Sequence, residues 1–125
     1  MGVAAMGLPE GRRGPPQVAG WLGLAQRAGK VCSGDVATRL AVQSGRARAV
    51  VVASDAGSST ARRFVELCRQ TNCPLLRWGD KVALGRALGR PPRSVAAVTD
   101  AALAGGLARL VGHTTVRGEA RGYSR

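Results

Sequence analysis

The stretch that decides the fold is Lys30-Val31-Cys32-Ser33-Gly34-Asp35-Val36-Ala37-Thr38-Arg39-Leu40-Ala41-Val42-Gln43-Ser44-Gly45. It begins like a short extended segment, turns sharply at Ser-Gly-Asp, and continues as a helix that ends at a glycine. The free amides and partial positive charge at the N-terminus of a helix suit an anionic ligand. This turn is therefore the first candidate binding feature of the chain.

The rest of the chain alternates between helical and extended patterns. Apolar residues at helical spacing predict helices at 16–28, about 60–71, 81–88 and 101–110. Short apolar runs bounded by turn residues predict strands at 49–53, 75–78 and 94–98. The alternation predicts an α/β fold, a three-layer α/β/α sandwich around a small four-stranded mixed sheet.

The length of 125 residues favours one domain. Residues 1–15 are rich in Gly, Pro and Arg, which predicts a disordered basic arm. The expected domain occupies 16–111, and a flexible tail is expected over 112–125.

The charge balance is strongly basic, with 19 Lys and Arg against 7 Asp and Glu, a net charge of +12. A polyanionic partner, first of all a nucleic acid, is the leading interpretation. The alternative is compositional, because 17 of the 19 cations are Arg and the chain is rich in Ala and Gly, as in high-GC coding sequences. We expect a cytoplasmic protein with no membrane partner, since neither a signal peptide nor an apolar run of about 18–20 residues is evident.

Four aspartates, Asp35, Asp55, Asp80 and Asp100, each precede or open a predicted helix. Capping or first-turn charge explains them better than acid–base chemistry does. Neither a Gly-x-Ser-x-Gly elbow nor a phosphate-binding Gly-x4-Gly-Lys loop is present. We therefore expect no enzymatic activity and no catalytic residues.

The three cysteines, Cys32, Cys68 and Cys73, have no metal-ligand spacing, and the only histidine is His113. Reduced, largely buried thiols are expected. The sequence thus predicts neither a metal site nor a cofactor.

Several blocks, taken in order, resemble one family. They are Leu22–Lys30, Ser33-Gly34 with Gly45, Val52–Asp55, Gly79–Gly89 and Val95–Asp100. The span 22–107 resembles the ribosomal L7Ae/L30e family of small RNA-binding proteins, most closely its bacterial YlxQ-type members. The resemblance implies the same sandwich and RNA binding, often at kink-turns, through two adjoining edges: the turn and helix start after Gly34, and the loop before the last strand.

The candidate RNA-binding residues that follow from these edges are Lys30, Ser33, Gly34, Asp35, Val36, Ala37, Arg39, Leu40, Asp55, Arg90, Pro91, Pro92, Arg93 and Ser94. The cationic side chains among them, and the amides at the turn, are expected to contact phosphates, which gives affinity and salt dependence but little sequence choice.

Three positions depart from the family's RNA-reading pattern. Where the resemblance implies Asn or Lys, Glu or Gln, and Lys, this chain has Val36, Ala37 and Leu40. The helical wheel alone groups these residues as core, together with Ala41 and Ser44. The resemblance instead turns Thr38, Ala41 and Val42 inward and leaves Val36 and Leu40 exposed.

Two functions remain open at this stage. The first is a non-catalytic, monomeric RNA-binding protein that associates with the ribosome or translation and takes rRNA or another structured RNA, kink-turns included. Translation-machinery proteins are further candidate partners. The alternative is a protein-interaction module that keeps the fold but has lost base reading, with Val36 and Leu40 as the contact.

Overall fold

The computed structural model describes residues 17–111. The expected arm at 1–15, Pro16 and the expected tail at 112–125 lie outside this range. The helices are α3 (Gln17–Arg27), α4 (Asp35–Gln43), α5 (Ser58–Thr71), α6 (Lys81–Ala87) and α7 (Ala101–Val111). The strands are β1 (Val31–Ser33), β2 (Ala49–Val52), β3 (Leu75–Arg77) and β4 (Val95–Val98). The predicted order of elements is confirmed.

The four strands form one sheet in the order β1-β4-β2-β3. β4 runs antiparallel to both β1 and β2, whereas β3 is parallel to β2, so the sheet is mixed as predicted. Every residue of the two central strands β2 and β4 is buried. This burial explains why their sequences, Ala-Val-Val-Val and Val-Ala-Ala-Val, are apolar at consecutive positions rather than at alternate ones.

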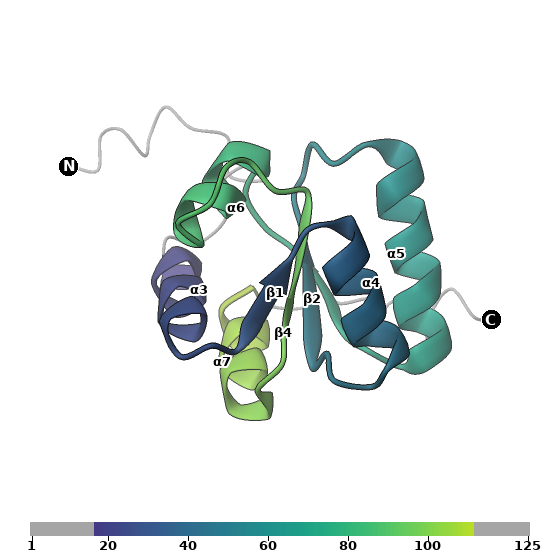
Figure 1. The fold of residues 1–125 in the computed structure, drawn as a ribbon, viewed down its shortest axis with the longest axis horizontal. Coiled ribbons are helices and arrows are strands. Elements are labelled where there is room, and N and C mark those ends of the chain that lie inside the picture. The colour runs from purple at the N-terminus through teal and green to yellow at the C-terminus, as the bar shows by residue number, and fades with distance from the viewer. Residues whose placement is uncertain (1–16, 112–125) are drawn as a thin grey trace.

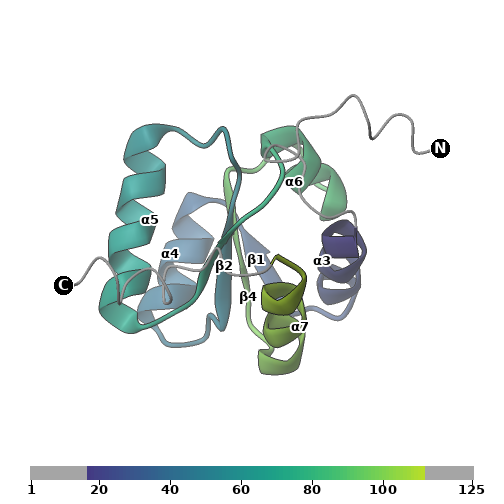
Figure 2. The same cartoon turned by 180° about the vertical axis from the view of Figure 1, so that it is seen from behind.

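Helices cover both faces of the sheet (Figures 1 and 2). α4 and α5 pack on one face, where Ala41, Phe64 and Cys68 contact a buried cluster that includes Val50 and Val52. α3, α6 and α7 cover the other face with a second cluster, to which they contribute Val18, Leu22, Leu84, Ala104 and Leu107, and Leu88 joins it directly after α6. The predicted three-layer sandwich is confirmed.

Two of the four aspartates cap the helix that follows them, as predicted. The carboxylate of Asp80 accepts a hydrogen bond from Ala83 N at 2.8 Å, and that of Asp100 accepts one from Leu103 N at 2.9 Å. Asp55 instead accepts from Lys81 N at 2.8 Å and so connects the β2–α5 loop to the start of α6.

The helix predicted at about 60–71 begins sooner than the sequence indicated, and Ser58 and Ser59 do not cap it. α5 begins earlier, at Ser58, and its N-cap is Gly57, which has no side chain to offer. Both serines are therefore inside the first turn of the helix, where their hydroxyls cannot take the N-cap position.

The topology places the important loops at the two ends of the sheet. The loops that follow β1, β2 and β3 and the loop that precedes β4 meet at one end, which we call the Gly34 end. The residues that precede β1, β2 and β3 and those that follow β4 meet at the opposite end, which we call the Arg48 end. α4, α5 and α6 all start at the Gly34 end.

All three cysteines lie within the described residues, and none of them forms a disulfide. Cys68 on α5 is fully buried, and Cys73 follows the left-handed residue Asn72 that ends this helix. A hydrogen bond with Cys73, together with burial, raises the pKa of the Cys68 thiol far above its ordinary range. Within residues 17–111 no group of three His, Cys, Asp or Glu side chains is arranged to hold a metal ion, and no helix is long and apolar enough to cross a membrane.

Candidate nucleic-acid interface

The turn at Gly34 is the backbone centre of the Gly34 end. Gly34 has φ 95° and ψ 161°, a conformation that a side chain would strain. Its N–H donates to Val95 O at 3.0 Å and its carbonyl accepts from Thr38 N at 3.0 Å. The turn is therefore fixed to β4, and Gly34 offers no side chain to cap the first amides of α4.

The loop before β4 lies directly on α6. Arg90 N donates to Gly85 O at 2.8 Å. A Cβ atom at Gly85 would lie 2.7 Å from the carbonyl carbon of Pro91 and 2.8 Å from Pro92 Cα, closer than real Cβ contacts allow. Gly85 thus permits the close approach that holds the 90–94 loop beside the Gly34 turn.

One hydrogen-bonded chain connects the elements at this end. The Arg93 guanidinium donates through Nε to Ser33 Oγ at 3.1 Å, and Arg93 N donates to Lys81 O at 3.1 Å. Lys81 N in turn donates to the Asp55 carboxylate. Residues far apart in the sequence are therefore brought together, and the sequence-predicted Ser33, Asp55 and Arg93 share one surface with Lys81.

Lys81 and Arg86 were not among the sequence-predicted residues. The available signal for Lys81 was its position directly after the Asp80 cap, at the start of a helix that follows a strand. Arg86 and Arg90 line a groove of about 480 Å³ with Val82 and the 89–92 loop. The cationic surface is consequently broader than the two predicted edges.

Asp35 holds two cations at the start of α4. Its carboxylate accepts from Arg39 Nη1 at 2.9 Å and from Arg63 Nη1 on α5 at 3.1 Å. All three side chains are between one third and one half exposed, so each ion pair contributes at most about 1 kcal/mol to stability. Arg39 was expected to contact phosphate. An RNA phosphate would therefore have to compete with the Asp35 carboxylate for its guanidinium.

The outward face of α4 is apolar. Val36 is 59% exposed and Leu40 53% exposed, whereas Thr38, Ala41 and Val42 are buried against the sheet. The orientation implied by the resemblance is confirmed, and the grouping from the helical wheel alone is wrong. The helical wheel fails here because one of the buried positions, 38, carries a polar residue, threonine.

Lys30 lies away from the other predicted residues. It precedes β1, and its carbonyl accepts from Thr99 N at 2.8 Å at the Arg48 end of the sheet. Four residue steps of extended chain lead from Lys30 to Gly34, a distance of about 13 Å. The structure therefore does not bring Lys30 together with the Gly34 turn.

The chain belongs to the ribosomal protein L7Ae/L30e/S12e/Gadd45 family, whose model matches residues 17–108. It is 37% identical over 90 residues to the RNA-binding protein YlxQ of Bacillus subtilis, an alignment that covers 72% of this chain and 90% of that protein.

Solved structures share the fold. A protein of unknown function from Bacillus halodurans C superposes with a TM-score of 0.75 at 34% identity, covering 78% of this chain and 98% of that one. The Giardia lamblia 15.5kD RNA binding protein superposes with a TM-score of 0.68 at 23% identity, covering 80% of this chain and 89% of its own. The latter likeness shows the fold alone.

Proposed function

We propose that this protein is a non-catalytic RNA-binding protein that binds structured RNA, kink-turns among the candidates, through the Gly34 end of the sheet. The observation that carries the proposal is the bonded chain from Ser33 through Arg93 and Lys81 to Asp55, which places the Arg93 guanidinium and the backbone of Lys81 beside the uncapped turn at Gly34. The family and its YlxQ relative support RNA as the ligand. Association with the ribosome or translation in the cytoplasm, as a monomer, is part of the proposal.

Phosphate contact is the chemistry that this surface offers best. The amides of the turn and the side chains of Arg93, Lys81 and Arg90 are donors or cations, which suit phosphate oxygens. Val36, Ala37 and Leu40 offer no hydrogen bond to a base edge. The protein should therefore recognise RNA mainly by backbone shape, with strong salt dependence.

The test compares binding to a kink-turn RNA and to an unrelated RNA duplex at 50 and 200 mM salt, by fluorescence anisotropy. We expect binding to both RNAs at low salt, a large loss at high salt and a preference for the kinked RNA. Equal affinity for the two RNAs would remove kink-turn preference from the proposal. The absence of binding at low salt would remove RNA binding itself.

Arg93→Ala, with Arg62→Ala as its matched control, locates the interface. Both variants lose one cation, but Arg62 lies exposed on α5, beside Arg77 of β3 rather than in the loop before β4. We expect Arg93→Ala to weaken binding about ten-fold and to reduce the salt slope by about one phosphate contact. An equal loss for both variants would indicate a non-specific charge effect.

The exposure of Val36 and Leu40 favours a second candidate function, a protein-interaction module. Two neighbouring aliphatic side chains on one helix face, flanked by Arg39 and Arg63, form an apolar spot in a charged surround. A protein bound there should be lost from a pull-down with Leu40→Lys. An unchanged set of captured proteins would count against this function.

A further inference from the structure

The Arg48 end of the sheet carries cations of its own. Arg48 N donates to Val98 O at 2.7 Å on one side of β4, and Lys30 O accepts from Thr99 N on the other. Two inter-strand spacings separate Lys30 from Arg48, about 10 Å. Both residues are exposed, and they lie at the end of the sheet remote from Gly34.

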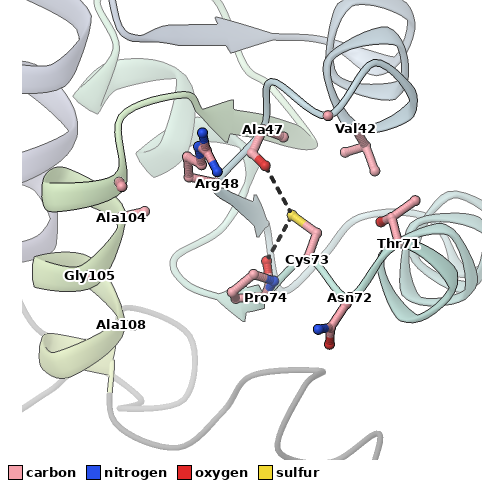
Figure 3. A pocket seen from close by; sticks show the side chains of 12 residues that line it. Val42, Ala47, Arg48, Thr71, Asn72, Cys73, Pro74, Ala104, Gly105 and Ala108 are labelled. Atoms are coloured by element: carbon pink, nitrogen blue, oxygen red, sulfur yellow. Dashed lines mark hydrogen bonds between the residues drawn. The ribbon is translucent and has the colours of Figure 1, made fainter.

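A cavity of about 470 Å³ opens beside Arg48 (Figure 3). One wall is the small-residue face of α7, with Ala104, Gly105 and Ala108. The facing wall comes from the segment Thr71–Pro74 and from the loop that includes Gly45 and Ala47. The walls are short side chains and backbone, which leave room for a flat group to enter.

The rim of this cavity is positively charged. Arg48 lines it, and the guanidinium of Arg109 lies over Gly105, because a Cβ atom there would be 3.8 Å from Arg109 Nη1. The carboxylate that follows β4, Asp100, accepts from Leu103 N and caps α7. Among residues 17–111, the ion pairs involve only Asp35 and Glu66 as acids, so Lys30, Arg48 and Arg109 are not neutralised by them.

We propose that the Arg48 end is a second RNA-binding site, which takes a single-stranded segment by inserting one unpaired base into the cavity and contacting the adjacent phosphates with Arg48, Lys30 and Arg109. Charge complementarity selects the polyanion. The cavity selects an unpaired nucleotide, because a base within a duplex is stacked and cannot enter a recess. A base packed against alanine and glycine makes van der Waals contacts there, and these contacts do not select among the four bases.

This site is separate from the interface at Gly34, so the two proposals succeed or fail independently. The two sites lie at opposite ends of the strands, and they face in opposite directions. A protein with both sites holds a structured RNA at one end and a single strand at the other.

Photocrosslinking with an oligouridylate that carries 4-thiouridine tests the site on the full chain. Trypsin yields two informative peptides, Val31–Arg39 from the Gly34 end and Gln70–Arg77 from the cavity wall, and each contains one cysteine. We expect nucleotide adducts on both. Arg48→Ala should lower the adduct on Gln70–Arg77 at least about three-fold and leave the adduct on Val31–Arg39 unchanged.

Ala108→Phe provides a variant without a change in charge, because the larger side chain fills the cavity from α7. It should remove the Gln70–Arg77 adduct as well, with thermal melting to verify the fold. Arg93→Ala should do the reverse and lower the adduct on Val31–Arg39 only.

Adducts confined to Val31–Arg39 would overturn the second site and leave the proposed function intact. Adducts confined to Gln70–Arg77 would support the second site, and the interface for structured RNA at Gly34 would still be decided by the kink-turn binding test. Adducts on Gln70–Arg77 that persist in both Arg48→Ala and Ala108→Phe would also overturn the site, since neither its charge nor its cavity would then matter.

Discussion

Backbone and side chains offer different chemistry at the Gly34 turn. The amides after Gly34 are donors fixed by the hydrogen bond to Val95 O, while the next outward side chains, Val36 and Leu40, are aliphatic. Donors suit phosphate oxygens, and aliphatic groups cannot pair with a base edge. At this scale the Gly34 turn offers donors that suit phosphate oxygens, whereas Val36, Ala37 and Leu40 offer no hydrogen bond to a base edge.

Replacing the three departing side chains should restore base reading. In the variant Val36→Asn, Ala37→Glu and Leu40→Lys, we expect the affinity for kink-turn RNA to rise about ten-fold or more, because each good base contact contributes about 1–3 kcal/mol. Leu24→Lys is the matched control, since Leu24 is 47% exposed on α3, away from the turn. An equal gain with Leu24→Lys, or none with the triple variant, would contradict this register of α4.

Thr38 carries a buried polar atom without a hydrogen bond. Its side chain is fully buried, and Oγ1 has no partner among the described residues. Thr38→Val replaces the hydroxyl with a methyl group of the same shape and should increase the free energy of unfolding by about 1 kcal/mol in urea titration. Thr71→Val, which removes an exposed hydroxyl bonded to Leu67 O, should not stabilise; a loss of stability in Thr38→Val would show that the hydroxyl finds a partner.

Sequence patterns indicated Arg93 for the Gly34 end but did not indicate Lys81, for a simple physical reason. Arg93 was predicted through the loop before the last strand, but its contact with Ser33 joins residues 60 apart. Backbone hydrogen bonds of the folded chain place Lys81 on the same surface. Lys30 precedes β1 and therefore lies at the opposite end of the sheet. Proximity in sequence does not show which end of a strand a residue occupies.

At the scale of elements, α6 and the loop after it behave as one unit. Gly85 accepts from both Leu88 N and Arg90 N, and the two prolines of the loop pack on it. The sequence shows a basic loop with two prolines before the last strand, and the structure shows that a glycine on the preceding helix sets the position of that loop.

Gly85→Ala should displace the 90–94 loop. The new methyl group would collide with Pro91 and Pro92, so we expect a loss of about 1–3 kcal/mol in the free energy of unfolding and a weaker RNA affinity. Gly20→Ala is the control, because Gly20 lies in α3 with no atom within 4 Å of the added Cβ and should gain about 0.5–1 kcal/mol. Unchanged stability and RNA binding in Gly85→Ala would show that the loop is not held by this contact.

The end of α5 should make stability depend on alkaline pH. The Cys68 pKa is raised in the folded state by the hydrogen bond with Cys73 and by burial, so its thiol stays protonated after an unfolded thiol has ionised near about pH 8.5. The contribution of Cys68 to the free energy of unfolding is fully present below that pH. It decreases as the pH rises above it, by up to about 1.4 kcal/mol per pH unit.

Urea unfolding at pH 8 and pH 10 measures this effect. The wild type should lose more stability over this interval than Cys68→Ala, and Cys32→Ala, which alters a half-buried thiol, should resemble the wild type. Parallel pH dependence in all three proteins would contradict the assignment to Cys68.

At the scale of the molecule, the sequence was informative wherever burial dominated. β2 and β4 are apolar at every position because both faces of the central strands are covered, and the glycines at 34, 45, 79 and 89 mark turns with positive φ. The cavity at the Arg48 end could not be predicted, since its walls come from α7, the end of α5 and two loops. Such a cavity depends on how the three layers pack against one another, and a local sequence pattern does not predict that packing.

The charge of the molecule gives the last prediction. A net charge of +12 on 125 residues repels itself in the folded state, and few of the cations of residues 17–111 are paired with acids. Raising NaCl from about 0.01 to 0.15 M shortens the Debye length from about 30 to 8 Å and should raise Tm by about 4 °C. The variant Arg62→Gln/Arg77→Gln, which removes two cations beside one groove on α5, should melt higher at low salt and respond less to NaCl. A Tm that falls with salt would mean that the surface ion pairs of Asp35 and Glu66 outweigh the repulsion. In that case a polyanionic partner would no longer be expected to stabilise the fold by neutralising it.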